Sequence, residues 1–177
     1  MPISLVEALA ETKTVEKRIG KKREFVLAYL LRQEKFKDPL EKEGGSVSAI
    51  QRELQAIHDL EERKIAIRRE IQKVNATNSI TVGGETRSIA DWLAWRREVA
   101  PGIQKFQQDV RQRIEAHRQQ AMRAGAAVTS GGEAKPDDII VNMSESTLAA
   151  QIERLEETLG TLDGLLSLKN ATLILDL

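Results

Sequence analysis

The chain has 177 residues, no cysteine, and 27 basic against 27 acidic side chains. The lack of cysteine excludes disulfide bonds, zinc–thiolate sites and thiol catalysis, and a net charge of zero gives no electrostatic reason to expect nucleic acid or an anionic membrane as a partner. Hydrophobic residues reach 41% and charged residues 31%, but aromatic residues only 3%. This composition is typical of long helices or coiled coils rather than of a compact core built on aromatic side chains.

The first predicted helix covers residues 4–37. Ser4 and Glu7 have the spacing of a capping box, in which the hydroxyl and the carboxylate satisfy free amides of the first turn. Segment 25–31 is apolar on most sides, so we expect it to be buried from more than one direction. Asp38–Pro39 predicts the end of the helix, because proline disfavours the α conformation in the residue before it.

The second predicted helix covers residues 46–76, and Ser46 can cap it. Its apolar positions follow a helical period: Val47, Ile50, Leu54, Ile57, Leu60, Ile67, Ile71 and Val74. The connection through Gly44–Gly45 is short, and short connections join antiparallel neighbours. We therefore expect the first two helices to form an antiparallel hairpin.

A β-hairpin is predicted over residues 79–89, because two β-branched runs flank Gly83–Gly84, which can supply the positive φ angles of a two-residue turn. A third helix over residues 88–124 begins at Ser88 and is kinked or split by Pro101. Its apolar positions, three and four apart, are Trp92, Trp95, Val99, Ile103, Phe106, Val110, Ile114 and Ala121.

Small and charged residues over 125–138 predict a flexible exposed loop. The apolar run 139–141 has room for one strand, which we expect at the edge of the 79–89 hairpin. A fourth helix over residues 144–170 carries the clearest heptad seam of the chain: Leu148, Ile152, Leu155, Leu159, Leu162 and Leu166. Gly160 and Gly164 weaken this helix and permit the close approach of a neighbour.

Together these elements predict a mainly α fold. We expect one domain over residues 1–177, an elongated antiparallel bundle or coiled coil of about four long helices with the small β element inserted. The tail over residues 173–177 is too apolar to remain free, so it should pack on its own bundle or on a partner.

No catalytic, cofactor or metal site is predicted. His58 and His117 lie mid-helix without a second histidine at ligand spacing. Gly83–Gly84 lacks the Lys-Ser/Thr of a phosphate loop and the spacing of a dinucleotide fingerprint, and no nucleophile elbow occurs. We expect a protein that is not an enzyme and binds no cofactor.

Apolar residues beyond the seams indicate a protein interface. Trp92 and Trp95 share a helix face and form either a core cluster under the hairpin or an anchor for a partner. The fourth helix and the tail carry more apolar surface than one intramolecular partner covers. The candidate interface residues are Trp92, Trp95, Leu165, Leu168, Leu173, Ile174, Leu175 and Leu177. The expected partners are further copies of the chain or other structural proteins, with neither nucleic acid nor membrane.

Charge is unevenly distributed. Residues 13–23 are mostly basic, and the region from Glu153 to Asp176 is mostly acidic. These are either solvated helix faces or complementary ends, in which one subunit's basic end meets another's acidic end.

Several short motifs carry a family resemblance. These are the N-terminal helix 5–11, the run 71–78 entering the Gly-turn hairpin, the run 88–97, and a leucine-rich last helix with Leu162–Asp163 and Lys169–Asn170 near its end. Together they resemble the septicolysin-like family of small helical bacterial and phage proteins. The resemblance implies no catalytic residues, and the family's toxin-like name implies pore formation. The stretch Trp95-Arg96-Arg97 is also similar to small proteins encoded among tailed-phage structural genes.

The expected function is therefore that of a structural or assembly protein acting through helix-mediated contacts, with a head, connector or tail component of a phage virion as the leading candidate. The alternatives are a membrane-active, pore-forming toxin and, more weakly, a coiled-coil adaptor. The expected location is the cytoplasm when the protein is made, and the virion in the phage case.

Overall fold

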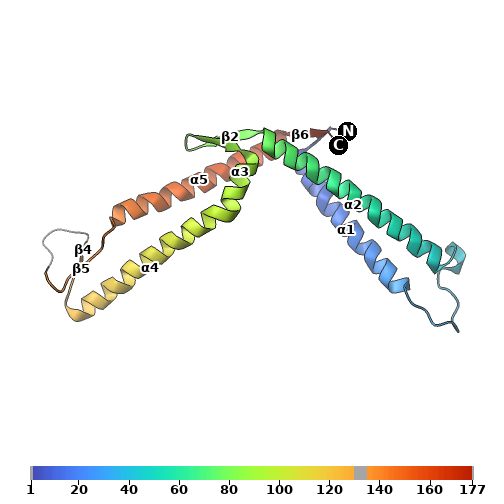
Figure 1. Ribbon diagram of the computed structural model, residues 1–177, viewed down its shortest axis with the longest axis horizontal. Coiled ribbons are helices and arrows are strands. Elements are labelled where there is room, and N and C mark those ends of the chain that lie inside the picture. The colour runs from blue at the N-terminus through green and yellow to red at the C-terminus, as the bar shows by residue number, and fades with distance from the viewer. Residues whose placement is uncertain (1, 130–134, 177) are drawn as a thin grey trace. The chain divides into compact units, whose positions relative to one another are not determined.

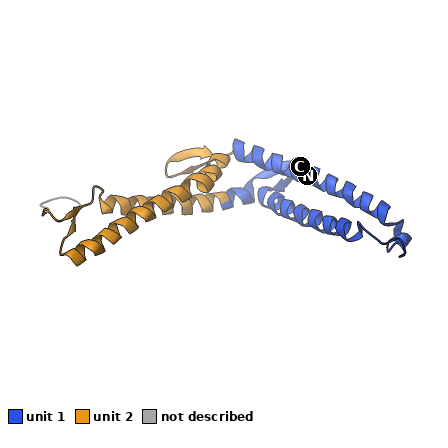
Figure 2. Cartoon of the chain, turned by 60° about the horizontal axis from the view of Figure 1, so that its bottom comes forward, with its two compact units in different colours: residues 1–77, 167–177 blue, residues 78–166 orange. Residues whose placement is uncertain are grey.

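The computed structural model describes residues 2–129 and 135–176. Helices account for 73% of it and the described strands form three short pairs, which confirms a mainly α fold with small β elements. The chain divides into two compact units: unit 1 comprises residues 1–77 and 167–177, and unit 2 comprises residues 78–166 (Figure 2). That the four long helices form one elongated bundle and one domain stays a prediction.

Unit 1 is built on two long antiparallel helices (Figure 1). Its elements are β1 (Pro2–Ser4), α1 (Leu5–Tyr29), the 3-10 turn η1 (Glu41–Glu43), α2 (Ser46–Thr77), the last turns of α5 (Glu145–Thr172) and β6 (Ile174–Asp176). Ion pairs fix the antiparallel direction, because Lys22 near the end of α1 binds Glu53 near the start of α2, whereas Glu11 binds Arg63. The predicted hairpin of the first two helices is thus present.

The start of α1 follows its sequence signal. Ser4 Oγ accepts a hydrogen bond from the Glu7 amide at 3.3 Å, and the Glu7 carboxylate accepts one from the Ser4 amide at 2.7 Å. The predicted capping box is confirmed. The Ser4 amide, and after it the Ser4 hydroxyl, lowers the pKa of the Glu7 carboxyl group.

The end of α1 differs from the prediction, because the helix stops at Tyr29 and not at residue 37. The pairing of Lys22 with Glu53 places the end of α1 opposite the start of α2, so later residues have no helix to pack on. The expectation that segment 25–31 is buried from several directions is wrong, since Leu31 is 87% exposed.

Asp38 organises the connection that follows α1. Its carboxylate accepts hydrogen bonds from the Leu40 amide, the Ser46 amide and the Ser46 hydroxyl. Ser46 is the first residue of α2, so Asp38 satisfies a free amide of that helix start across the loop. The Ser46 hydroxyl, followed by the two amides, lowers the pKa of the Asp38 carboxyl group.

The two chain ends meet in unit 1. Strands β1 and β6 pair antiparallel, with Pro2 opposite Asp176, and the Leu5 amide donates to the Leu173 carbonyl oxygen at 2.9 Å. Leu175 is 1% exposed in a cluster with Leu5, Ala8, Ile67 and Ile71. A second cluster joins Val15, Ile19 and Ile57 farther along the hairpin. The tail therefore packs on its own chain.

Unit 2 also contains a pair of antiparallel helices. Its elements are β2 (Ser79–Val82), β3 (Glu85–Ser88), α3 (Ile89–Ala94), the π-helical turn η2 (Trp95–Val99), α4 (Ala100–Ala124), β4 (Val128–Thr129), β5 (Ile139–Ile140) and α5 up to residue 166. Arg118 near the end of α4 binds Glu145 at the start of α5, and Arg96 binds Asp163. The predicted hairpin is confirmed, and Gly83 and Gly84 have φ angles of 58° and 84°.

The third predicted helix is split as expected at Pro101. Ser88 caps α3 by accepting from the Asp91 amide at 3.0 Å. Residues 95–99 then form a π-helical turn, and Pro101 lies in the first turn of α4. Because proline has no amide hydrogen and its ring clashes with the preceding turn, a wider turn at this point accommodates it.

The expected third strand has a different partner. Strand β5 pairs in parallel with β4, with Val128 opposite Ile139, and not with the 79–89 hairpin. The left-handed Gly125 ends α4, and Asp138 accepts hydrogen bonds from the amides of Ala127 and Lys135. These local bonds bring β4 and β5 together. The middle of the predicted flexible loop, residues 130–134, lies outside the described residues.

Substitution of Asp38 tests the anchor of the α1–α2 connection. The carboxylate has a lowered pKa in the folded protein, so its contribution is present above the unfolded pKa and is lost as pH falls through the folded value. Asp38→Asn should therefore lower the thermal unfolding midpoint at neutral pH, and the difference from wild type should shrink below about pH 4.

Asp109→Asn, at an exposed position of α4, is the matched control and should follow wild type across the pH range. A constant difference between Asp38→Asn and wild type down to pH 2 would contradict an ionised anchor.

Candidate protein–protein interface

Of the two tryptophans, Trp92 belongs to the core of unit 2. It is 2% exposed, and its Nε1 donates to the Ile80 carbonyl oxygen at 3.1 Å. The half-buried Trp95 contacts it edge-on with ring centroids 5.5 Å apart, and the Arg87 guanidinium lies over the Trp92 ring. Trp92 therefore supports the hairpin, and Trp95 is the one of the pair that a partner could reach.

The candidate residues near the C-terminus fall into three groups. Leu175 is buried and Leu173 is half-buried in unit 1. Leu165 is half-buried in unit 2, whereas Leu168 and Ile174 are exposed by more than half. Leu177 lies outside the described residues. Only part of the predicted apolar surface is thus open to a partner.

A larger exposed surface lies on α4 and the residue before it. Val99, Ile103, Phe106 and Val110 follow the spacing four, three, four that places side chains on one helix face. Val99 is 47% and Phe106 63% exposed, and Val110 is half-buried. We call this face the α4 stripe. The sequence pattern identified these positions, but as part of a buried seam.

The π-helical turn explains why the α4 stripe is exposed. A π turn adds one residue and rotates the helix that follows it by about 100°. The buried positions of α4 are consequently Ala100, Gln107 and Ala121. The first two each lie one residue after an expected seam position, Val99 and Phe106. The buried positions lie at heptad spacing on a face adjacent to the α4 stripe.

A second exposed apolar region lies where the α1–α2 connection begins and ends. Leu27 lies in the last turn of α1, Leu30, Leu31 and Phe36 follow in the connection, and Val47 is at the start of α2. All five side chains are more than half exposed. We call this region the α1–α2 tip. Three basic residues accompany it in the sequence: Arg32, Lys35 and Lys37.

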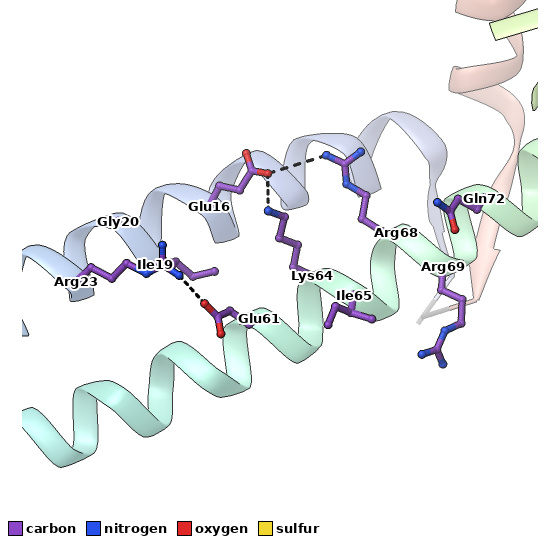
Figure 3. Close-up of a pocket in the computed structure, with 10 residues that line it drawn as sticks. All are labelled: Glu16, Ile19, Gly20, Arg23, Glu61, Lys64, Ile65, Arg68, Arg69 and Gln72. Atoms are coloured by element: carbon purple, nitrogen blue, oxygen red, sulfur yellow. Dashed lines mark hydrogen bonds and ion pairs between the residues drawn. The ribbon is translucent and has the colours of Figure 1, made fainter. Parts of the chain in front are cut away.

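Between α1 and α2, unit 1 has an open groove of about 770 Å³ (Figure 3). Ile19 and Ile65 supply its apolar part, and Gly20 leaves one side without a side chain. Charged side chains line the rest: Glu16, Arg23, Glu61, Lys64, Arg68 and Arg69.

Internal ion pairs neutralise only part of the groove. Arg23 binds Glu61 at 2.7 Å, and Glu16 binds Lys64 at 2.9 Å with Arg68 at 4.0 Å. The hydrogen bond from Lys64 is the largest cause that lowers the pKa of the Glu16 carboxyl group. The lining holds four cationic side chains and two carboxylates, and Arg69, which extends away from α1 in Figure 3, forms no ion pair with a described residue. The groove therefore carries an excess of two positive charges.

Among residues 2–129 and 135–176, no group of three His, Asp or Glu side chains is arranged to hold a metal ion. None of the helices in the described part of the chain combines the length and apolarity needed to cross a lipid bilayer. The α4 stripe and the α1–α2 tip expose apolar area, and the groove carries uncompensated charge. Both properties are typical of surfaces that bind another macromolecule.

No protein-family model, curated protein or solved structure matches the chain. The resemblance to septicolysin-like and phage structural proteins therefore stays a prediction.

Truncating the buried tail leucine tests whether the tail belongs to the core of unit 1. Leu175→Ala should destabilise unit 1 by about 2–5 kcal/mol, the usual cost of removing a fully buried leucine side chain. Denaturant unfolding followed by circular dichroism measures the change.

Ile174→Ala is the matched control, because Ile174 is the neighbouring residue but is 57% exposed. It should change the free energy of unfolding by less than about 1 kcal/mol. Equal effects of the two substitutions would contradict the placement of Leu175 in the core.

Proposed function

We propose that this protein is a non-enzymatic structural protein that assembles through helix-mediated contacts with further copies of itself or with other structural proteins. The α4 stripe carries the proposal. Its four apolar side chains have coiled-coil spacing and lie beside the buried face of α4, and three of them are exposed by a third or more. Such a seam is typical of a helix that pairs with another helix.

The apolar area of the α4 stripe is comparable with the cost of pairing. Full burial of a Val, Ile or Phe side chain contributes about 1.5–3 kcal/mol, and a symmetric pair of stripes buries each residue twice. Because these side chains are only partly exposed in the single chain, the gain is smaller than full burial would give and is of the same order as the about 4–15 kcal/mol that association costs in lost freedom. Pairing through the α4 stripe alone is therefore expected to be weak.

The setting proposed for this assembly is the virion of a tailed phage. Its support is the similarity of Trp95-Arg96-Arg97 to phage structural proteins, together with long charged helices and an exposed pairing seam. The genes adjacent to the coding sequence test it: portal, capsid or tail genes are the expected neighbours, and a set of metabolic genes would contradict it.

Reversal of the chemistry at the centre of the α4 stripe tests the pairing. Phe106→Arg places a charge in the seam, so it should weaken self-association about 10- to 100-fold, as expected for the loss of one buried phenylalanine. Sedimentation velocity over a range of protein concentrations measures the change. The helix content should stay at the wild-type value, because Phe106 is 63% exposed.

Gln108→Arg is the matched control, since it adds the same charge to an exposed position two residues along α4, on the opposite helix face. It should sediment like wild type. An unchanged mass for Phe106→Arg, in a chain that associates, would show that the α4 stripe is not the contact.

The α1–α2 tip favours a second candidate, a membrane-active protein. Leu30, Leu31 and Phe36 are exposed next to Arg32 and Lys35, a combination that suits insertion between anionic lipid headgroups. This candidate predicts that the protein releases dye from anionic vesicles and that Leu31→Glu abolishes the release. Leu168→Glu, at another exposed leucine of unit 1, should leave the release intact. If the wild-type protein releases no dye, the membrane-active candidate is wrong and assembly is the only proposed function that remains.

A further inference from the structure

The groove between α1 and α2 is open at Gly20, and this glycine does not stabilise the helix in which it lies. A Cβ atom added at Gly20 would meet no heavy atom within 4 Å, and its backbone is helical. Glycine in a helix interior is less stable than alanine. Unit 1 would thus be more stable with a side chain at this position, and the glycine leaves room for another backbone to approach.

The lining of the groove has the spacing of helix faces. Glu16, Gly20 and Arg23 lie along one face of α1, and Ile65, Arg68 and Gln72 lie along the facing side of α2. Two antiparallel helices with an open groove between them offer a site for a third helix. Its excess of two positive charges selects a helix that carries carboxylates.

One described face of the chain has the matching properties. Glu153, Glu157, Gly160 and Gly164 follow one another on the solvent side of α5 at the spacing four, three, four. All four are exposed, and neither carboxylate forms an ion pair with a described residue. A Cβ atom at either glycine would also meet nothing within 4 Å. We call this face the α5 acidic stripe.

The two units carry opposite net charge. Basic residues outnumber acidic residues by 17 to 14 in unit 1, whereas acidic residues outnumber basic residues by 13 to 10 in unit 2. The charges of the two surfaces match more closely than those of the units, since the α5 acidic stripe has two unpaired carboxylates and the groove has an excess of two positive charges. A neutral chain with such halves attracts further copies through unlike units.

We infer that the groove at Gly20 is a docking site for an acidic helix, and that its occupant is the α5 acidic stripe of a second copy of this chain. Arg68 and Arg69 bind Glu153 and Glu157, and the glycines of both surfaces allow the backbones to approach closely. The inference rests on the proposed function, because it supplies a contact for the same self-assembly. It differs from the α4 stripe in joining two unlike surfaces.

This difference has a consequence for the assembly. A contact between two unlike surfaces leaves one free groove and one free stripe on each dimer, unless a ring closes. The number of copies should therefore rise beyond two as protein concentration increases. Because charge drives the contact, added salt should lower the mass.

The test separates the groove from the α4 contact by placing every variant in a Phe106→Arg background, which weakens the α4 contact. Gly20→Leu fills the groove and Gly164→Leu fills the stripe, and both remain compatible with a helix. We expect the background chain to associate in sedimentation velocity, and each leucine variant alone to be monomeric with an unfolding midpoint no lower than that of the background. Lys21→Leu, an exposed neighbour on α1, is the control and should associate like the background.

A mixture of the two leucine variants tests whether the groove of one chain binds the stripe of another. The Gly20→Leu chain keeps an intact stripe and the Gly164→Leu chain keeps an intact groove, so an equimolar mixture should form a 1:1 complex and nothing larger. Arg69→Glu should also prevent association, and adding Glu157→Lys to the same chain should restore it.

Two results would overturn the inference. A leucine variant that associates like the background shows that its surface is not used. A background chain that is monomeric at every concentration shows that there is no second contact, and it leaves the α4 pairing of the proposed function standing.

Discussion

A pair of helices has no enclosed interior, and this constraint governs the whole protein. Away from the strand pairs, each helix can bury only the stripe that faces its partner, as in the cluster of Val15, Ile19 and Ile57 and in the heptad of α5. With aromatic residues at 3%, little bulky volume is available to close the flanks. Apolar side chains that fall on any other stripe remain in water, and they become either a cost to solubility or an interface. The α4 stripe, the α1–α2 tip and the Gly20 groove all arise from this geometry.

Local backbone events decide which stripe is buried. In unit 2, the turn at residues 95–99 rotates α4, so that Ala100 and Gln107 face inward and Phe106 faces outward. In unit 1, Asp38 ties the connection to the first residue of α2, which leaves Leu31 without a neighbour. Neither arrangement gains stability from the exposed apolar residues. Their exposure, and in α4 their regular helical spacing, is the physical reason to assign them to contacts outside the chain.

The parts of the fold that depend on adjacent residues were predictable from the sequence. The capping box at Ser4, the cap at Ser88, the Gly83–Gly84 turn and the heptad of α5 all appear where their signals lie. Two wrong predictions involve residues farther apart: the end of α1 depends on the start of α2, and strand β5 depends on a bond from Ala127 to Asp138. For the candidate interface, alternation along β6 separates buried Leu175 from exposed Ile174, which composition cannot reveal. The α4 stripe was visible as a pattern, but a one-residue π insertion reversed its expected burial.

The central claim is that another protein chain covers the apolar stripes left open by this thin architecture. Amide hydrogen exchange over residues 99–110, measured as a function of protein concentration, tests it most directly. The account predicts that protection of these amides rises as concentration passes the association range, while amides around the buried Leu5, which lies in neither proposed contact, stay unchanged. Identical exchange over residues 99–110 from the most dilute to the most concentrated sample would show that no copy of the chain covers the stripe, and would contradict self-assembly through α4.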